Sequence, residues 1–187
     1  LTTGIENSSL GYNSLKHNQT GNYNTSIGTF SAENVLTNYN TSMGYESLNK
    51  NYIGESNTSI GFKSMRNDAS GNENTSIGYL SMMDTSGNFN TSLGAHSLKY
   101  TKTDDNTSIG HESQHLLQNG TYNTTLGSKS LKTNVDGSNN VAIGFSSMEN
   151  KKGSNNVSVG ALSLHEKNLG EDNVSIGYQS MHLSLIH

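Results

Sequence analysis

The chain of 187 residues contains no cysteine, no proline and no tryptophan, and only 14% of its residues are charged. Without cysteine it can form neither disulfide bonds nor thiolate zinc sites. Without proline, every residue keeps the backbone N–H that a β-ladder needs. No apolar run approaches the ~18 residues of a membrane span, so none is expected. A net charge of -4 with scattered basic residues argues against nucleic-acid binding.

Hydrophobic residues are also scarce, at 30% of the chain with a mean hydropathy of -0.64. This composition excludes a single thick hydrophobic core. It does not match a disordered chain either, because the net charge is small and the apolar residues recur at fixed intervals. We expect one repetitive domain over residues 1–187, and we expect it to be an excerpt of a longer fibrous protein.

A five-residue motif, Asn-Thr-Ser-Ile-Gly in its commonest form, recurs along the whole sequence. Its eleven copies end at glycines separated by 16 or 17 residues, from Gly11 to Gly177. A serine follows each glycine after three positions, and the next residue is usually leucine or methionine, with Ala32 and Gln114 among the exceptions. Such a short period is typical of a solenoid.

The motif predicts a short β-strand. In one copy, β-branched Thr25 and Ile27 share one face under the two-residue period, and Ser26 takes the other. We expect the aliphatic fourth residue to point inward, Gly28 to allow a tight turn, and Ser31 to begin a second short strand. Asparagine side chains and serine or threonine hydroxyls would form ladders between coils. The expected fold is all-β, a parallel β-solenoid or β-roll of about eleven coils of 16–17 residues.

The residues predicted to carry this fold are columns of the repeat: asparagines for the ladder, aliphatic residues for the core, and glycines and serines for the turns. A residue that recurs in every coil is taken as structural, so we predict no catalytic residue and no cofactor. The structural positions are Asn24, Ile27, Gly28, Ser31, Asn40, Gly44, Asn57, Ile60, Gly61, Asn74, Ile77, Gly78, Asn90, Gly94, Asn106, Ile109, Gly110, Asn123, Gly127, Asn140, Ile143, Gly144, Asn156, Gly160, Asn173, Ile176 and Gly177.

One such rod is predicted to be marginally stable by itself. Each coil offers about two large apolar side chains at ~1.5–3 kcal/mol each, against ~1–2 kcal/mol of backbone entropy per ordered residue. We therefore expect several rods to associate along their length. Aromatic residues after the repeat glycine are a candidate seam between chains, and ordinary packing over a turn explains them equally well. They are Tyr12, Tyr45, Phe62, Tyr79, Phe145 and Tyr178.

The copies that begin at Asn140, Asn156 and Asn173 resemble the head repeat of trimeric autotransporter adhesins of the YadA type. They are also similar to Asn-Thr-Ala-Ile-Gly arrays in fibre proteins of phages, large viruses and environmental bacteria. The resemblance implies a left-handed β-roll, an obligate homotrimer of side-by-side chains, and exposure on a cell or virion surface. The expected function is a non-enzymatic extracellular fibre or filament that attaches through many repeated surfaces to a host-surface or matrix protein or glycan.

Three alternative functions stay open. The array could be a phage or virus tail-fibre shaft. It could be an ice-binding solenoid with a row of threonines, although the strand interpretation uses that face for the core. It could be a filament coated with N-glycans, because Asn-Thr-Ser is also a glycosylation sequon. We favour the ladder role, since a laddered asparagine cannot carry a sugar. The candidate glycosylation sites are Asn7, Asn18, Asn24, Asn40, Asn57, Asn74, Asn90, Asn106, Asn119, Asn123, Asn156 and Asn173.

The remaining polar residues predict no metal site. His111 and His115 with Glu112 lack a further ligand placed by the sequence, so we expect solvated histidines there. The acidic pairs at 104–105 and 171–172 lack the Gly-rich nonapeptide of calcium-binding rolls. The histidines do not recur at one position of the repeat; they are His17, His96, His111, His115, His165, His182 and His187.

Overall fold

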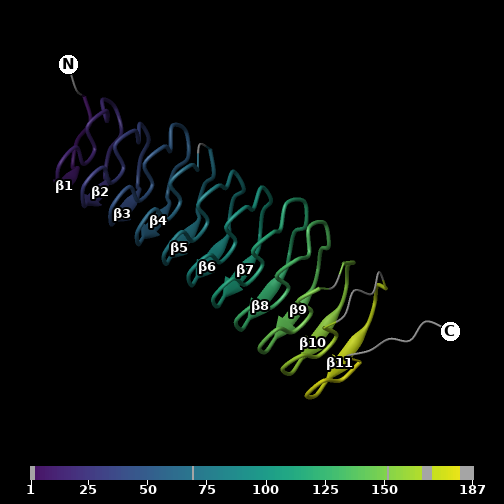
Figure 1. Ribbon diagram of the computed structural model, residues 1–187. Coiled ribbons are helices and arrows are strands. Elements are labelled where there is room, and N and C mark those ends of the chain that lie inside the picture. The colour runs from purple at the N-terminus through teal and green to yellow at the C-terminus, as the bar shows by residue number, and fades with distance from the viewer. Residues whose placement is uncertain (1–2, 69, 151, 166–169, 182–187) are drawn as a thin grey trace.

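The computed structural model describes residues 3–68, 70–150, 152–165 and 170–181. In this part of the chain the regular structure is all-β, with eleven three-residue strands and no helix. The strands form one parallel sheet in sequence order, β1 at one end and β11 at the other (Figure 1). Each strand is reached from the previous one by a full turn of chain, so the fold is a β-solenoid of about ten turns.

The strands occupy the centre of the repeated motif, and we name each coil after its strand. They are β1 (Ser8–Leu10), β2 (Thr25–Ile27), β3 (Thr41–Met43), β4 (Thr58–Ile60), β5 (Thr75–Ile77), β6 (Thr91–Leu93), β7 (Thr107–Ile109), β8 (Thr124–Leu126), β9 (Val141–Ile143), β10 (Val157–Val159) and β11 (Val174–Ile176).

The strands pair without any slip in register. Thr25 pairs with Thr41, and Thr41 pairs with Thr58. Equivalent residues therefore form columns with steps of ~4.8 Å, and the sheet is roughly 50 Å long. The predicted parallel solenoid is confirmed.

The predicted direction of the strand side chains is wrong. Ser26, in the middle of β2, is fully buried, whereas Ile27 is 37% exposed and Thr25 is also exposed. The middle residue is buried in every strand from β2 to β11. Size explains the inversion: a leucine or methionine from the turn already fills the narrow interior, so the strand can add only a small side chain.

The predicted second strand is also wrong, because the chain after each glycine is a turn. In coil 2, Gly28 has a φ of 130°, and Phe30 and Ala32 have φ values of 55° and 47°. These angles lie outside the extended region that a strand requires. The same turn recurs in every coil, and in coils 2 to 10 it places the residue after the serine inside.

The hydrophobic core is a column with one main side chain per coil. Loop residues Val35 and Leu117 are buried against it. The aliphatic column of the strands, which was predicted to form the core, lies outside instead. The buried members from the turns are Ala32, Leu48, Met65, Met82, Leu98, Leu131, Met148 and Leu164.

Gln114 interrupts this column between Leu98 and Leu131. Its side chain is fully buried, and neither amide atom has a hydrogen-bond partner. The apolar contacts accordingly separate into one cluster from Ala32 to Leu117 and another that begins at Leu131. An unpaired buried amide is destabilising, because it has lost its hydrogen bonds to water.

Replacing Gln114 by leucine is expected to stabilise the protein by about 1–3 kcal/mol, because it removes the unpaired amide. The backbone suits leucine, since φ is 46° at Gln114, 47° at Leu98 and 51° at Leu131. Urea unfolding measures the effect. The reverse change, Leu98→Gln, is the matched control and should destabilise. A stabilising Leu98→Gln, or a destabilising Gln114→Leu, would contradict this description of the core.

Candidate functional site

From Asn7 to Asn140, each repeat asparagine makes two hydrogen bonds to the next coil. The side-chain oxygen of Asn90 accepts the backbone N–H of Asn106 at 3.0 Å, and its amide nitrogen donates to the carbonyl of Thr103 at 2.7 Å. Asn24 makes the same two contacts, at 2.8 Å and 2.7 Å, with Asn40 and Thr37. The side chain thus supplies one acceptor and one donor at a fixed reach. The predicted asparagine ladder is confirmed.

Replacing Asn90 by alanine is expected to destabilise the protein by about 2–4 kcal/mol, because the N–H of Asn106 and the carbonyl of Thr103 lose their partner. Urea unfolding tests this value. Asn119→Ala is the matched control: its side chain is exposed and donates to Asp136 Oδ1 at 2.7 Å. That variant should lose less than about 1 kcal/mol. Equal losses of unfolding free energy in the two variants would show that the buried ladder contributes no more stability than an exposed hydrogen bond.

A chain of buried hydroxyl groups runs parallel to the asparagine ladder. The Oγ atoms of Ser81 and Ser92 are 2.7 Å apart. Ser92 Oγ donates to the carbonyl of Ser97 in the same coil at 3.1 Å, and Ser97 Oγ donates to Ser108 Oγ in the next at 2.8 Å. Serine in the strand and serine in the turn therefore pair inside the solenoid. These two polar ladders hold the strand rigidly and turn its other residues outward.

Most candidate glycosylation sites lie in the asparagine ladder. Their side chains are buried and their amide nitrogens donate hydrogen bonds, so a sugar at that atom does not fit the folded coil. Asn119 differs because it is exposed, and its amide donates to Asp136 at 2.7 Å. Asn7 is also exposed, and Asn18 and Asn173 are half-buried. The buried set is Asn24, Asn40, Asn57, Asn74, Asn90, Asn106, Asn123 and Asn156.

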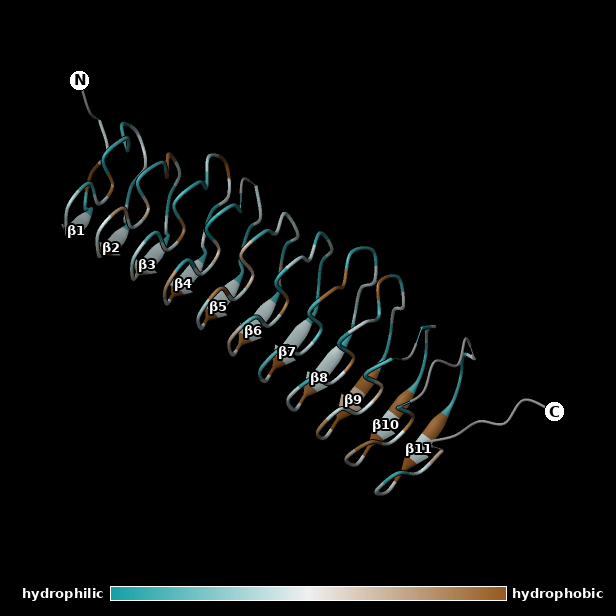
Figure 2. Ribbon diagram, viewed as in Figure 1, coloured by the Kyte–Doolittle hydropathy of each residue, from teal (hydrophilic) through white to brown (hydrophobic). Residues whose placement is uncertain are grey.

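The outward strand residues make a continuous face, which we call the sheet face. Its first column is threonine in β2–β8 and valine in β9–β11, and its second column is aliphatic in ten strands and methionine in β3. Neither column contains a charged residue. Figure 2 shows the change in character along the rod, with pale early strands and brown, more hydrophobic β9–β11. Leu93 and Leu126 are 45% and 49% exposed on this face.

Aromatic rings line the corner of the coil just after the repeat glycine. Phe62 stacks between Tyr45 and Tyr79, with ring centroids 5.4 Å and 5.3 Å apart. Phe30 meets Tyr45 edge-on at 6.1 Å. On the other side of the sheet face, just before the repeat asparagine, Tyr23 stacks on Tyr39 at 5.1 Å. The rings thus border the sheet face, and those that stack cover one another's faces and leave mainly their edges free.

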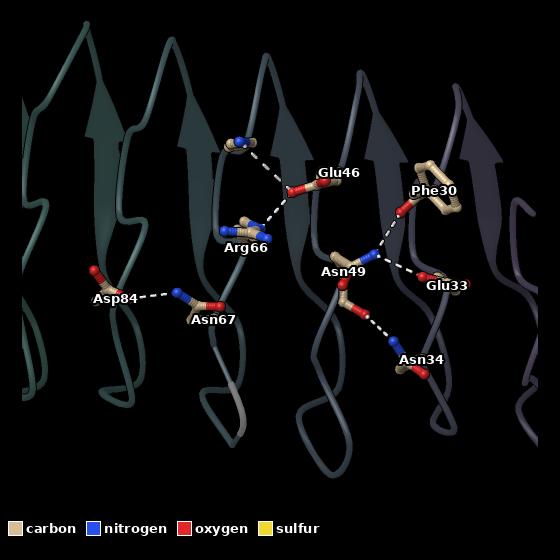
Figure 3. A network of polar contacts seen from close by, with 9 residues as sticks. Phe30, Glu33, Asn34, Glu46, Asn49, Arg66, Asn67 and Asp84 are labelled. Carbon is tan, nitrogen blue, oxygen red and sulfur yellow. Dashed lines mark hydrogen bonds and ion pairs between the residues drawn. The ribbon is translucent and has the colours of Figure 1, made fainter.

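Charged contacts between coils lie on the turns rather than on the sheet face. Glu46 pairs with Arg66, and it also lies 3.9 Å from Lys63 Nζ (Figure 3). One coil further, Asn67 donates to Asp84 Oδ1 at 2.5 Å. Partly exposed ion pairs of this kind contribute little stability. Because these charged residues lie on the turns, the two strand columns of the sheet face remain uncharged.

The described residues contain no three histidine, aspartate or glutamate side chains arranged to hold a metal ion, and no pocket. In the acidic pair at 104–105, Asp104 accepts the backbone N–H of Asn88 at 2.7 Å. His111 and His115 lie near each other and near His96, whereas positions 182 and 187 fall outside the described residues. No helix in the described ranges is long and apolar enough to span a membrane.

Comparison with family models, with curated proteins and with solved structures found no match. The class of the molecule is therefore defined by its own geometry: a β-solenoid whose asparagine and serine columns lie inside and whose threonine and aliphatic columns lie outside.

Proposed function

We propose that this chain is a segment of a non-enzymatic extracellular fibre or surface adhesin, built as a left-handed roll that associates side by side into a homotrimer. The observation that carries the proposal is the sheet face, with threonine and aliphatic side chains in register over the whole sheet. Large exposed apolar surfaces of this kind mark protein–protein contacts.

The size of the sheet face suits lateral association. Two columns over roughly 50 Å of sheet present on the order of 500 Å². The aromatic borders add to this area, which brings it toward the ~800 Å² per partner of a stable interface. The absence of charge removes a large desolvation cost. Association would also compensate for a core of about one large side chain per coil.

Attachment would then use the surfaces that stay outside the bundle, which are the turns and loops of every coil. Because these surfaces recur along the rod and in each chain, weak contacts to a host-surface or matrix protein or glycan would add up to firm attachment. A phage or virus fibre shaft would use the same arrangement on a different particle.

Sedimentation tests the association directly. We expect a native mass three times the 20.1 kDa polypeptide. Leu93→Glu places a charge in the centre of the sheet face and should yield monomers that stay folded by circular dichroism. Gln118→Glu adds the same charge on an exposed loop and should remain trimeric. A monomeric parent, or a Leu93→Glu variant that stays trimeric, would contradict the proposal.

Ice binding is the second candidate, because the threonine column faces outward and in register from β2 to β8. The sequence argument against it, that this face is needed for the core, no longer holds. Ice binding requires a free sheet face, so it predicts a monomer with thermal hysteresis that Thr75→Lys reduces. A trimer without hysteresis would dismiss it.

A further inference from the structure

In coils 6 and 7 the corner after the repeat glycine carries histidines. His96 occupies the position that Phe30 holds in coil 2, and His111 occupies the position of Tyr79 in coil 5. His115 lies against both coils. We call His96, His111 and His115 the histidine trio.

The histidine trio continues the ring contacts of the corner. His96 meets Tyr79 edge-on, with centroids 5.4 Å apart. It then contacts His111 at 6.3 Å and His115 at 6.0 Å. His115 also packs on Tyr100 at 5.4 Å. Imidazole rings therefore take the place of phenyl and phenol rings between these coils.

The surroundings of His96 favour its neutral form. His115 Nδ1 lies 3.1 Å from the carbonyl oxygen of His96, which ties the His115 ring to coil 6. His96 Nδ1 is buried and has no hydrogen-bond partner. A proton at that nitrogen would create a buried donor, with nothing to accept it.

On balance, the charges around His96 disfavour an added proton. Lys99 is close enough to His96 to disfavour its protonation, together with the other two histidines. Glu112 is the nearby carboxylate, and Lys132 already pairs with it at 2.8 Å. Asp84, whose backbone N–H meets the carbonyl of Lys99, accepts from Asn67 instead. Burial first, and then Lys99, His115 and His111, lower the pKa of His96, while Glu112 acts in the opposite direction.

We propose that His96 makes the histidine trio an acid-sensitive contact, which loosens the boundary between coils 6 and 7 when the His96 ring is protonated. The sign follows from the lowered pKa of His96 in the closed coils. In the unfolded or opened chain this ring takes up a proton as the pH falls below about 6.5, while in the closed coils it resists protonation. Stability at this boundary is therefore present above that pH and is lost as the pH falls through the pKa of His96.

Hydrogen exchange at about pH 7.5 and about pH 5.0, corrected for intrinsic rates, tests the proposal. The reporter amides are Glu112, bonded to Ala95, and Leu98, bonded to Ser113. We expect their protection to fall severalfold at the lower pH, while the amide of Glu46 in coil 3 keeps its protection. The variant His96→Phe/His111→Tyr restores residues that other coils carry, and should abolish the local loss.

Two results would overturn the proposal: no loss of protection at the lower pH, or the same loss in the variant. If the variant fails to fold, NMR titration of the parent decides the matter. A His96 pKa at or above about 6.5 would then overturn it, and a lower pKa together with the local loss would support it.

Discussion

Replacing Gly94 by alanine is expected to unfold the coils around it. A Cβ at this position would lie 2.5 Å from the carbonyl oxygen and 2.7 Å from the carbonyl carbon of Gly110 in the next coil. Both are backbone atoms held by the ladder, so neither can move aside easily. The φ of Gly94 is also +141°, which an L side chain rarely adopts. Backbone strain and steric overlap together should cost about 2–6 kcal/mol, and valine should cost more.

Gly177 provides the matched control for this prediction. Its φ of +125° is similar, but the nearest atom to its Cβ would be Ser180 Cβ at 3.8 Å. Gly177→Ala should therefore show only the backbone cost of about 1–3 kcal/mol. Thermal or urea unfolding of both variants separates the two causes. Equal losses would mean that close contact between coils contributes nothing at Gly94.

Replacing Asp68 by asparagine is expected to stabilise the protein strongly at alkaline pH and hardly at all in acid. Asp68 is fully buried; its Oδ1 accepts the N–H of Gly71 at 2.8 Å, and its Oδ2 has no partner. Burial raises the pKa of this carboxyl to about 7. Asn51 and Asn134 make the same turn with Gly54 and Gly137, at 2.7 Å and 2.6 Å. The asparagine variant thus has precedents in the chain itself.

The sign of the pH dependence follows from the raised pKa of Asp68. Below the unfolded pKa of about 3.9 both states are protonated and Asp68 costs nothing. As the pH rises, the unfolded chain releases the proton while the folded chain keeps it, so stability falls until the pH passes about 7. The full loss is on the order of 4 kcal/mol, from about three pKa units at 1.36 kcal/mol each.

Urea unfolding of the parent and Asp68→Asn at about pH 4 and about pH 8 measures this effect, because the pH slopes of all other groups cancel in the difference. Asp136→Asn, at an exposed carboxylate, should show no such difference. Asn51→Asp should install a similar slope one coil earlier. If Asp68→Asn has the same effect at both pH values, Asp68 is not a buried acid.

The repeat spacing was enough to predict the solenoid and the asparagine ladder. A column of identical residues at a fixed period requires stacked coils, and asparagine has both hydrogen-bonding groups that a ladder needs. The direction of the strand could not be predicted by the same rule. Ile27 is more hydrophobic than Ser26, but the interior width, set by Leu48 and its equivalents, admits only the smaller residue.

The turn that forms the core could not be predicted from local preference either. Leu48 and Met65 have φ values of 49° and 47°, which non-glycine residues seldom adopt without tertiary contacts. The sequence does indicate the place of Asp68. It stands three residues before Gly71, just as Asn51 stands three residues before Gly54, so both residues occupy the same position of the coil. The histidine trio is different: only the stacking of coils brings His96 close to residues fifteen and nineteen positions later.

The most direct test of the account is the reactivity of single cysteines at adjacent positions, which is simple to measure because the chain has none of its own. Cysteine in place of Ser92 should be protected from a thiol reagent at every protein concentration, since it points into the coil. Cysteine in place of Leu93 should react on dilution and become protected as chains associate. If the cysteine at position 92 reacts and the one at position 93 is always protected, the strand side chains point in the opposite directions. If the cysteine at position 93 reacts fully in the trimer, the interface lies elsewhere.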